Sequence, residues 1–391
     1  MDAASTSDAL TQVFSDLWRP GLTVAIGDGA GALGPHELAA LSDAARDVSS
    51  LRLVLGWLPG AADGLDPDAF ADVVVLMPSG GARQMLRSPA ARFVPARLSA
   101  WPALIAGPLR PDLLITRLVQ RDRLLHFGTE VSFQRGLMQA GVPVRAIVSD
   151  DGPSASAEPP ISPEKVRVIG TCHHPPVQQH REPDPIHEAL ADAVLRFVPP
   201  GARLQYGPGQ LGTALLRRAT VPLRIDTGLL TDAVVDLDRR GLLIGQPSAT
   251  YLVGTDELYR WADGRPILRG IEYTHDLTRL SCGEPFVAVN TVVEIDAVGQ
   301  VNVEGIGDTV IGGIGGHPDY CAAARASRGG LSIIATPSTV NGRSPLVEQL
   351  SRPASTAAHD VDMIVTESGH ADLRDADWSQ RRKLISELFS A

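Results

Sequence analysis

Short apolar, β-branched runs alternate with helical patterns from one end of this 391-residue chain to the other. In the first half, the runs predict strands at Leu22–Ile26, Leu51–Leu55, Asp72–Leu76, Asp112–Leu118, Val144–Val148 and Val166–Gly170. Helical patterns lie between several of them, as at Pro35–Arg46 and Ser132–Gly141. Such alternation is typical of α/β architecture. We therefore predict α/β domains with open, largely parallel sheets.

A proline- and glycine-rich break, Val198-Pro-Pro-Gly201, precedes a second series of the same kind. The chain length favours two domains. We predict an N-terminal α/β domain over 1–198 and a C-terminal α/β domain over 199–391. In the second half, Phe286–Ala297 and Gln300–Val303 are predicted to form a hairpin, with alternate residues of the first strand on one partly wet face.

Composition excludes several classes of protein. The net charge of −10 argues against nucleic acid as a main partner. No apolar run reaches the ~18 residues of a membrane span, and the acidic, polar start leads us to expect a cytoplasmic protein. The three cysteines, Cys172, Cys282 and Cys321, have no metal-ligand spacing, so neither a disulfide framework nor a metal site is predicted.

Two segments match the pattern G-x-G-x-x-G between a predicted strand and a helix. The first, Gly29–Gly34, has the context of a dinucleotide site. The next strand ends in Gly56-Trp57, however, without the acidic residue that holds a ribose. A structural turn, or a loop that faces a different ligand, is the favoured interpretation, and an NAD-linked oxidoreductase is kept as an alternative. The second, Gly207–Gly212, is either an anion site at a helix N-terminus or an ordinary turn.

Four histidines lie close together in the chain, at His173, His174, His180 and His187. Their spacing fits no metal site, and prolines between them indicate a loop. A loop that lines the mouth of an active site is one interpretation of this segment.

Glu294 stands in an apolar, β-branched run, and the glycine-rich segment Gly305–Gly316 begins eleven residues later. A carboxylate there is costly unless it has partners or faces a cleft. A nucleophile beside backbone donors is the outline of an acyl-transfer site. Glu367, at the end of another predicted strand, is a second candidate. For both residues the alternative is a carboxylate in solvent.

The second half resembles the acetyl-CoA hydrolase/transferase family, whose members are class I CoA-transferases. The resemblance is carried by an ordered series of segments: Leu204-Gln-Tyr-Gly-Pro-Gly209, Asp226-Thr-Gly-Leu-Leu-Thr-Asp232, Val289–Asn302, Gly313–Tyr320, Ser332–Thr339 and Val365–Arg374. Phe93–Ser99 and Arg110–Ile115 are weaker matches in the first half. The chain departs from the family at His317, where a glutamine is usual, and lacks the usual C-terminal extension.

The resemblance implies two α/β domains with the active site in the cleft between them. It implies that Glu294 attacks an acyl-CoA thioester, so that a glutamyl-CoA thioester forms and a second carboxylic acid then takes the CoA. By the same resemblance, the backbone N–H of Gly316 is the oxyanion donor and Glu367 is a supporting carboxylate. The resemblance also implies that five further residues bind the substrate or CoA: Gly207, Gly209, Gly313, Gly315 and His317.

The predicted substrates are an acyl-CoA and a small carboxylic acid, without a permanently bound cofactor. Two alternatives stay open. The same site could hydrolyse the thioester, or, given the departures from the family's pattern, the protein could bind CoA without catalysing a reaction. Neither nucleic acid nor membrane is predicted as a partner, and a homo-oligomer is expected from the fold size.

Overall fold

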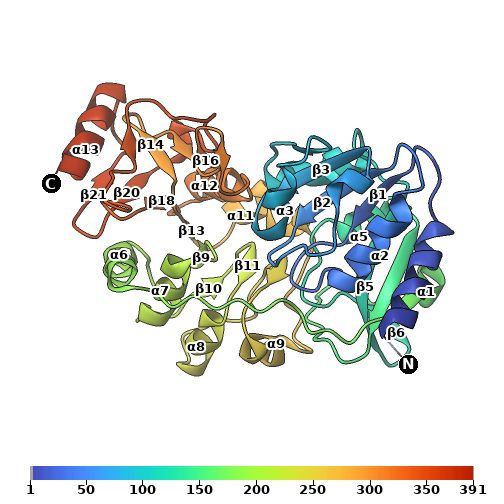
Figure 1. The fold of residues 1–391 in the computed structure, drawn as a ribbon. Helices are drawn as coiled ribbons and strands as arrows, with labels where there is room; N and C mark the ends of the chain where they lie inside the picture. The colour runs from blue at the N-terminus through green and yellow to red at the C-terminus, as the bar shows by residue number, and fades with distance from the viewer. Residues whose placement is uncertain (1–2, 391) are drawn as a thin grey trace.

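The computed structural model describes residues 3–390 and consists of two lobes, each built on one main sheet (Figure 1). The first sheet has the order β4-β3-β2-β1-β5-β7-β8, and β6 pairs with β5. Every pairing in it is parallel except that of β5 with β6. Its strands are β1 (Thr23–Ile26), β2 (Arg52–Trp57), β3 (Asp72–Met77), β4 (Ala91–Phe93), β5 (Leu113–Arg121), β6 (Leu124–His126), β7 (Val144–Ser149) and β8 (Arg167–Thr171).

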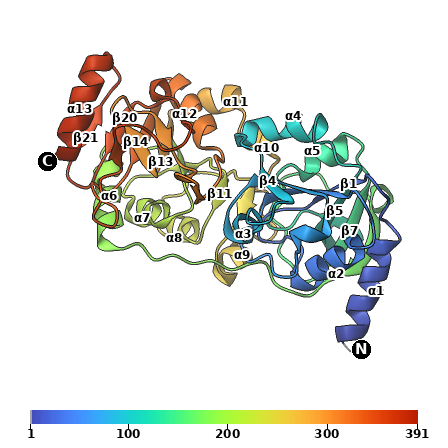
Figure 2. The ribbon, with the colours of Figure 1, turned by 45° about the horizontal axis from the view of Figure 1, so that its top comes forward.

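Helices cover both faces of the first sheet, with α1 and α2 on one face and α4 and α5 on the other (Figure 2). Successive strand residues point to opposite faces: Val24 and Ile26 pack in one core, and Ala25 packs in the other. The helices of this half are α1 (Ala3–Ser15), α2 (Pro35–Ala45), α3 (Gly80–Met85), α4 (Trp101–Ala106) and α5 (Gln134–Gln139), with 3-10 turns at Pro67–Ala69, Leu98–Ala100 and Pro163–Lys165.

The second main sheet has the order β10-β9-β13-β18-β20-β21, and only β21 is antiparallel to its neighbour. Its strands are β9 (Arg203–Tyr206), β10 (Arg224–Ile225), β13 (Phe286–Asn290), β18 (Leu331–Ala335), β20 (Met363–Val365) and β21 (His370–Asp372). Small sheets join β11 (Leu229–Leu230) to β12 (Tyr251–Leu252), β14 (Glu294–Asp296) to β15 (Val301–Asn302) and β19 (Leu346–Val347), and β16 (Gly305–Ile306) to β17 (Thr309–Val310).

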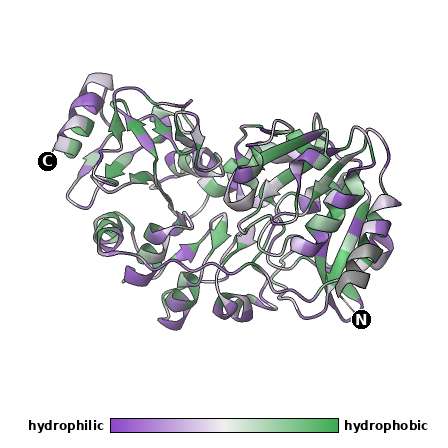
Figure 3. Ribbon diagram, in the orientation of Figure 1, coloured by the Kyte–Doolittle hydropathy of each residue, from purple (hydrophilic) through white to green (hydrophobic). Residues whose placement is uncertain are grey.

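The helices of the second half are α6 (Pro185–Leu195), α7 (Gln210–Arg218), α8 (Ala233–Arg239), α9 (Asp256–Ala262), α10 (Ile271–Thr274), α11 (Leu277–Ser281), α12 (His317–Ala326) and α13 (Trp378–Ser390), with a 3-10 turn at Ala358–Asp360. Of these, α10 contacts α4 of the first half. Hydrophobic residues are concentrated in the strands of both lobes, and hydrophilic residues are frequent on the outer helices and the loops (Figure 3). The predicted fold class, α/β with largely parallel sheets, is confirmed. Among residues 3–390, no helix is long and apolar enough to cross a membrane.

The two halves are linked by more than one crossing of the chain. The extended segment 172–184, called the strap below, runs from the end of β8 to α6 along both lobes (Figure 1). Residues from the second half also return to the first, through bridges of Tyr251 to Glu130 and of Gly270 to Ser132. Helix α6 contacts α7 and β18. The domain boundary at residue 198 stays a prediction, but α6 packs with the second sheet.

The predicted strand Phe286–Ala297 is wrong in its extent. Strand β13 ends at Asn290, and the chain then leaves the main sheet, where the backbone N–H of Val293 donates to the carbonyl of Asn302 at 2.9 Å. The predicted hairpin is present beyond this break, as the antiparallel pairing of β14 with β15. Glu294 and Asp296 are 6% and 8% exposed. The predicted wet face is therefore absent: the Glu294 side chain is covered by Asn302 and Ser351, and β19 pairs with the other edge of β14.

Candidate active site

A cavity of about 560 Å³ lies between the two halves, at the carboxyl ends of strands from both main sheets. The first half contributes Trp57 at the end of β2 and Ser79 beyond β3, and the second contributes Gly209 beyond β9 and Thr291 beyond β13. In open α/β sheets, ligands bind beyond the carboxyl ends of the strands. Because both sheets direct these ends into one cavity, it is the candidate active site.

The glycine loop after β9 borders open space in this cavity. A Cβ atom added to Gly207 or Gly209 would meet no atom within 4 Å. Gly209 is also the N-cap of α7, whose first turn faces the cavity through Thr213. The free backbone N–H groups of a helix N-terminus attract anions. Of the predicted site residues, Gly209 is the one that lines the cavity directly.

Two arginines at the cavity wall have no carboxylate partner within the described part of the chain. Arg83 comes from α3 of the first half, and Arg181 comes from the strap. Arg217, by contrast, is paired with Glu182 and Asp236, and His180 contacts Glu182 and Asp232. The contact with Glu182 raises the pKa of His180. The wall therefore offers two unpaired positive charges to an anionic ligand.

Glu294 lies one layer behind this wall. Its Oε2 atom accepts three hydrogen bonds, from Asn302 Nδ2 at 2.7 Å and from the backbone and hydroxyl of Ser351 at 2.9 Å each. Asn302 Oδ1 in turn accepts from the backbone of Glu304, and the carbonyl of Glu304 accepts from Ile311, which lines the cavity. The carboxylate is thus held in one orientation by three donors, but it does not itself line the cavity.

The glycines at 313–316 pack against protein. A Cβ on Gly313 would lie 2.7 Å from Met77 Sδ, and the carbonyl of Gly315 accepts from Leu98 at 2.9 Å. A Cβ on Gly316 would lie 2.5 Å from Nε2 of His275, a buried ring whose pKa falls to about 3 because of its burial. This loop joins the two halves, and its roles in CoA binding and as an oxyanion hole stay predictions.

His317 and Glu367 are both held by hydroxyl groups. His317 Nδ1 lies 2.7 Å from Thr356 Oγ1, and its Nε2 lies 3.1 Å from the carbonyl of Thr291, a residue of the cavity wall. Burial lowers the pKa of His317 to about 4, so Nε2–H of the neutral ring donates to that carbonyl. Partial burial raises the pKa of Glu367, but two hydrogen bonds from Ser338 outweigh it and the pKa is lowered overall.

Sequence reasoning missed the basic side chains of the wall, because exposed arginines such as Arg83 carry no periodic signal. It did identify the histidine-rich loop as a segment that could line the site, and His180 and Arg181 of that loop do line the cavity. The buried acids Asp28 and Glu130 were also missed. For Glu130, the available signal was a lone acid in Phe127–Phe133, a segment with no other charged residue.

Comparison with known proteins agrees with this architecture. The two largely parallel α/β lobes with a cavity between them are the arrangement that the predicted resemblance implies. Residues 254–388 match the acetyl-CoA hydrolase/transferase C-terminal domain, and the predicted resemblance to that family is thereby confirmed.

The 4-hydroxybutyrate coenzyme A transferase of Clostridium kluyveri is 25% identical over 334 residues, 80% of this chain and 78% of that one. The succinyl-CoA:cyclohexane-1-carboxylate CoA transferase of Geobacter metallireducens is 31% identical over 253 residues, 56% of this chain and 57% of that one. Among solved structures, RipA from Yersinia pestis has a TM-score of 0.87 and 24% identity, with 99% of this chain and 96% of that one covered. The last likeness concerns the fold alone.

Proposed function

We propose that this chain transfers CoA between an acyl-CoA and a carboxylic acid in the cavity between its two halves. The observation that carries the proposal is the cavity itself: its wall combines an open glycine loop, a helix N-terminus and the unpaired charges of Arg83 and Arg181. CoA carries phosphates at the end remote from its thioester. Binding energy from that end can be used at the reacting carbonyl. Several relatives, including the two bacterial enzymes above, are named as CoA-transferases.

In the proposed mechanism, a carboxylate of Glu294 attacks the thioester carbonyl and releases CoA thiolate, which leaves an acyl-glutamyl anhydride. The thiolate then attacks the glutamyl carbonyl, frees the first acid and leaves a glutamyl-CoA thioester. A second carboxylate reverses these steps. The contacts of Glu294 with Asn302 and Ser351 support the orientation of Oε1 as the attacking atom, since all three donors bind Oε2. If water replaces the second carboxylate, the same steps give hydrolysis, in keeping with the family's name.

The first test is chemical. The protein is mixed with a panel of acyl-CoAs and carboxylic acids, exchange is followed by chromatography, and borohydride-treated protein is mapped by mass spectrometry. We expect exchange and a reduced adduct at residue 294. Glu294→Gln is expected to lower kcat by roughly 10⁴-fold or more, as does loss of other enzyme nucleophiles. Glu304→Gln is the matched control, because Glu304 is also buried and lies in the same hydrogen-bond chain.

The possible outcomes test the proposed activity and the role of Glu294 as the nucleophile separately. No exchange and no hydrolysis with any acyl-CoA would refute the proposed function and leave a CoA-binding protein. Exchange that survives in Glu294→Gln as well as in Glu304→Gln would keep the function and refute the role of Glu294. Cytoplasmic location and a homo-oligomeric state stay predictions alongside this proposal.

A further inference from the structure

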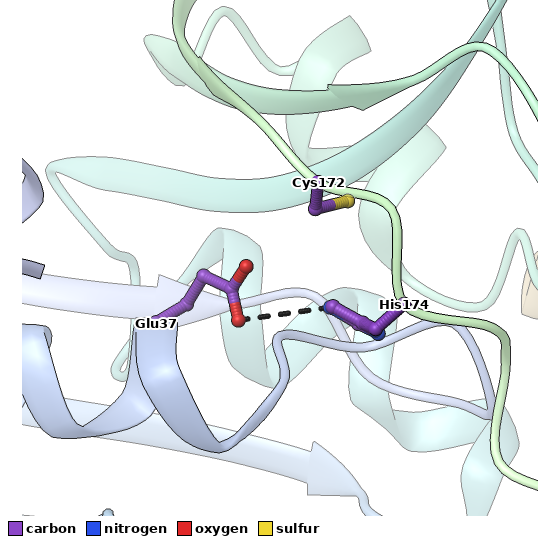
Figure 4. Close-up of side chains that lie close together, drawn as sticks. All are labelled: Glu37, Cys172 and His174. Atoms are coloured by element: carbon purple, nitrogen blue, oxygen red, sulfur yellow. Dashed lines mark ion pairs between the residues drawn. The ribbon is translucent and has the colours of Figure 1, made fainter. Parts of the chain in front are cut away.

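Three side chains with metal-binding atoms converge at the start of the strap, away from the cavity between the halves. Glu37 comes from the first turn of α2, and Cys172 and His174 come from the strap just beyond β8 (Figure 4). The Sγ atom, a ring nitrogen and a carboxylate oxygen all lie within 4.8 Å of one another. Cys172 is 5% exposed and Glu37 is 7% exposed. The cluster is therefore largely withdrawn from water.

One oxygen of the carboxylate in this cluster lacks a hydrogen-bond partner among the described residues. Glu37 Oε2 is buried and accepts no hydrogen bond from any described residue, and the side chain of Glu37 is only 9% exposed. The Nε2 atom of His174 lies 3.6 Å from Glu37 Oε2, which is too long for a hydrogen bond. A buried carboxylate oxygen without a donor costs free energy. A cation between these atoms would remove that cost.

We propose that Glu37, Cys172 and His174 bind a divalent metal ion of the zinc class. A thiolate, an imidazole and a carboxylate together form a ligand set that suits Zn²⁺, whereas Mg²⁺ and Ca²⁺ prefer oxygen ligands alone. If the three ligand atoms lie 4.8 Å from one another, the point equidistant from them is about 2.8 Å from each. Metal–ligand bonds of about 2.0–2.3 Å then require each ligand atom to move by less than about 1 Å. Three protein ligands leave a fourth position for water.

The second nitrogen of His174 has the partners that a metal-bound ring requires. Its Nδ1 lies 3.3 Å from the carbonyl of Pro175 and 3.1 Å from the guanidinium of Arg117. Without metal, Nδ1 accepts from Arg117. With metal on Nε2, Nδ1 carries the proton and donates to Pro175, as ligating histidines commonly do to a carbonyl. Arg117 keeps its 2.7 Å bond to the carbonyl of His174 in both states.

The thiol and Gly34 are consistent with the same site. Burial raises the pKa of the Cys172 thiol, with Arg117 acting in the opposite direction, so Cys172 is not an activated nucleophile. Metal binding would displace its proton, and affinity should fall as the pH is lowered. Gly34 passes so close that an added Cβ would lie 2.8 Å from His174 Nε2 and 2.9 Å from Glu37 Oε2. A side chain there would fill the metal's place.

A metal at this position would attach the strap to α2. Beyond His174, the strap is also bound through Val177 to the carbonyl of Ala30, and it then delivers His180 and Arg181 to the wall of the cavity. The proposed ion is therefore structural, and it does not depend on the reaction proposed above.

The test is cobalt and zinc binding by the full chain without an affinity tag. We expect one Co²⁺ per chain, displaced by Zn²⁺, with the near-ultraviolet absorption of a cobalt–thiolate bond. Cys172→Ser should abolish that absorption, and Glu37→Gln and His174→Ala should each weaken binding by about 100-fold or more, since even outer-shell changes cost 10–100-fold. Controls are Cys282→Ser, which removes an exposed thiol, and His173→Ala, the neighbouring exposed histidine.

Absence of the thiolate absorption in the wild-type chain at saturating Co²⁺ would overturn the proposal. So would wild-type affinity in Cys172→Ser, or equal weakening by His173→Ala and His174→Ala. The Co²⁺ titration of the wild-type chain needs no variant, so it decides the test even if a variant fails to fold. Zn²⁺ should also raise the unfolding temperature of the wild-type chain, and Mg²⁺ should not.

Discussion

Two loops of this chain share the pattern G-x-G-x-x-G, and each lies between a strand and a helix. One is packed against protein atoms, and the other borders open space. At Gly29–Gly34, Cβ atoms added to Gly29 and Gly31 would lie within 2.7 Å of the buried carboxylate of Glu130. At Gly207–Gly212, Cβ atoms on the first two glycines would meet nothing within 4 Å. One loop is closed over an acid of its own domain, and the other is open to the cavity.

The difference shows why such a motif does not identify a ligand. In both loops the glycines permit a tight turn. What approaches the backbone is set by other segments: Glu130 accepts from the N–H of Gly31 at 2.9 Å, in the position where a dinucleotide phosphate would accept it. A pyrophosphate there would meet both a steric and an electrostatic barrier. The NAD alternative is thereby disfavoured, and the open loop remains for an anionic substrate.

The largest expected difference between the loops is in stability. Gly29→Ala would place Cβ 2.5 Å from Glu130 and force alanine to φ +94°. Strain and overpacking of this kind cost about 3–5 kcal/mol together. Gly209→Ala, at φ −83° with open space, should lower the free energy of unfolding by no more than about 1 kcal/mol, the cost of alanine at a helix N-cap. Urea unfolding of both variants measures the contrast, and equal losses would mean that the second loop is also packed.

The closed loop should also make stability depend on pH. Burial raises the pKa of Asp28 to about 6 and that of Glu130 to about 7. Because folding favours the protonated acids, their contribution is fully present below about pH 4 and is lost as the pH rises through 6–7. For Asp28 alone the loss is roughly 3 kcal/mol.

Asp28→Asn removes that contribution while it keeps an acceptor for Tyr251 and Ser132, which now donate at 2.8 and 3.0 Å. The difference in unfolding free energy between wild type and Asp28→Asn should therefore shift against the wild type between pH 4.5 and 8. Denaturant unfolding across this range measures it. A difference that stays constant with pH would show that Asp28 titrates as it does in the unfolded chain.

The alternation of strands and helices predicted the central strands of the sheets well because both faces of these strands are buried. Leu53, Val54 and Leu55, for example, are fully buried on alternate faces of β2. The extent of β13 was not predictable in the same way. Its apolar run continues through Thr291–Val293, and only the ends of neighbouring strands decide where a strand leaves a sheet.

The site was predictable only where local sequence determines it. The glycine loop at 207–209 was identified, and it does border the cavity. Glu294 was singled out by its apolar neighbours, which correctly indicate a buried carboxylate but not what lies in front of it. Arg83 and Arg181 reach the cavity from distant segments, and Cys172 and His174 meet Glu37 only through the fold. Such sets depend on contacts between segments far apart in the chain.

The smallest expected effect is a change in substrate binding at the open loop, Gly207–Gly212. If Gly209 borders the bound CoA ester, the methyl group of Gly209→Ala enters space that the substrate occupies. KM for the acyl-CoA should then rise about three- to tenfold with kcat nearly unchanged, because the lost contact is shared by ground and transition states. In Gly29→Ala, protein that remains folded should keep the wild-type KM. Steady-state kinetics with one acyl-CoA separates the two, and an unchanged KM in Gly209→Ala would place the substrate away from this loop.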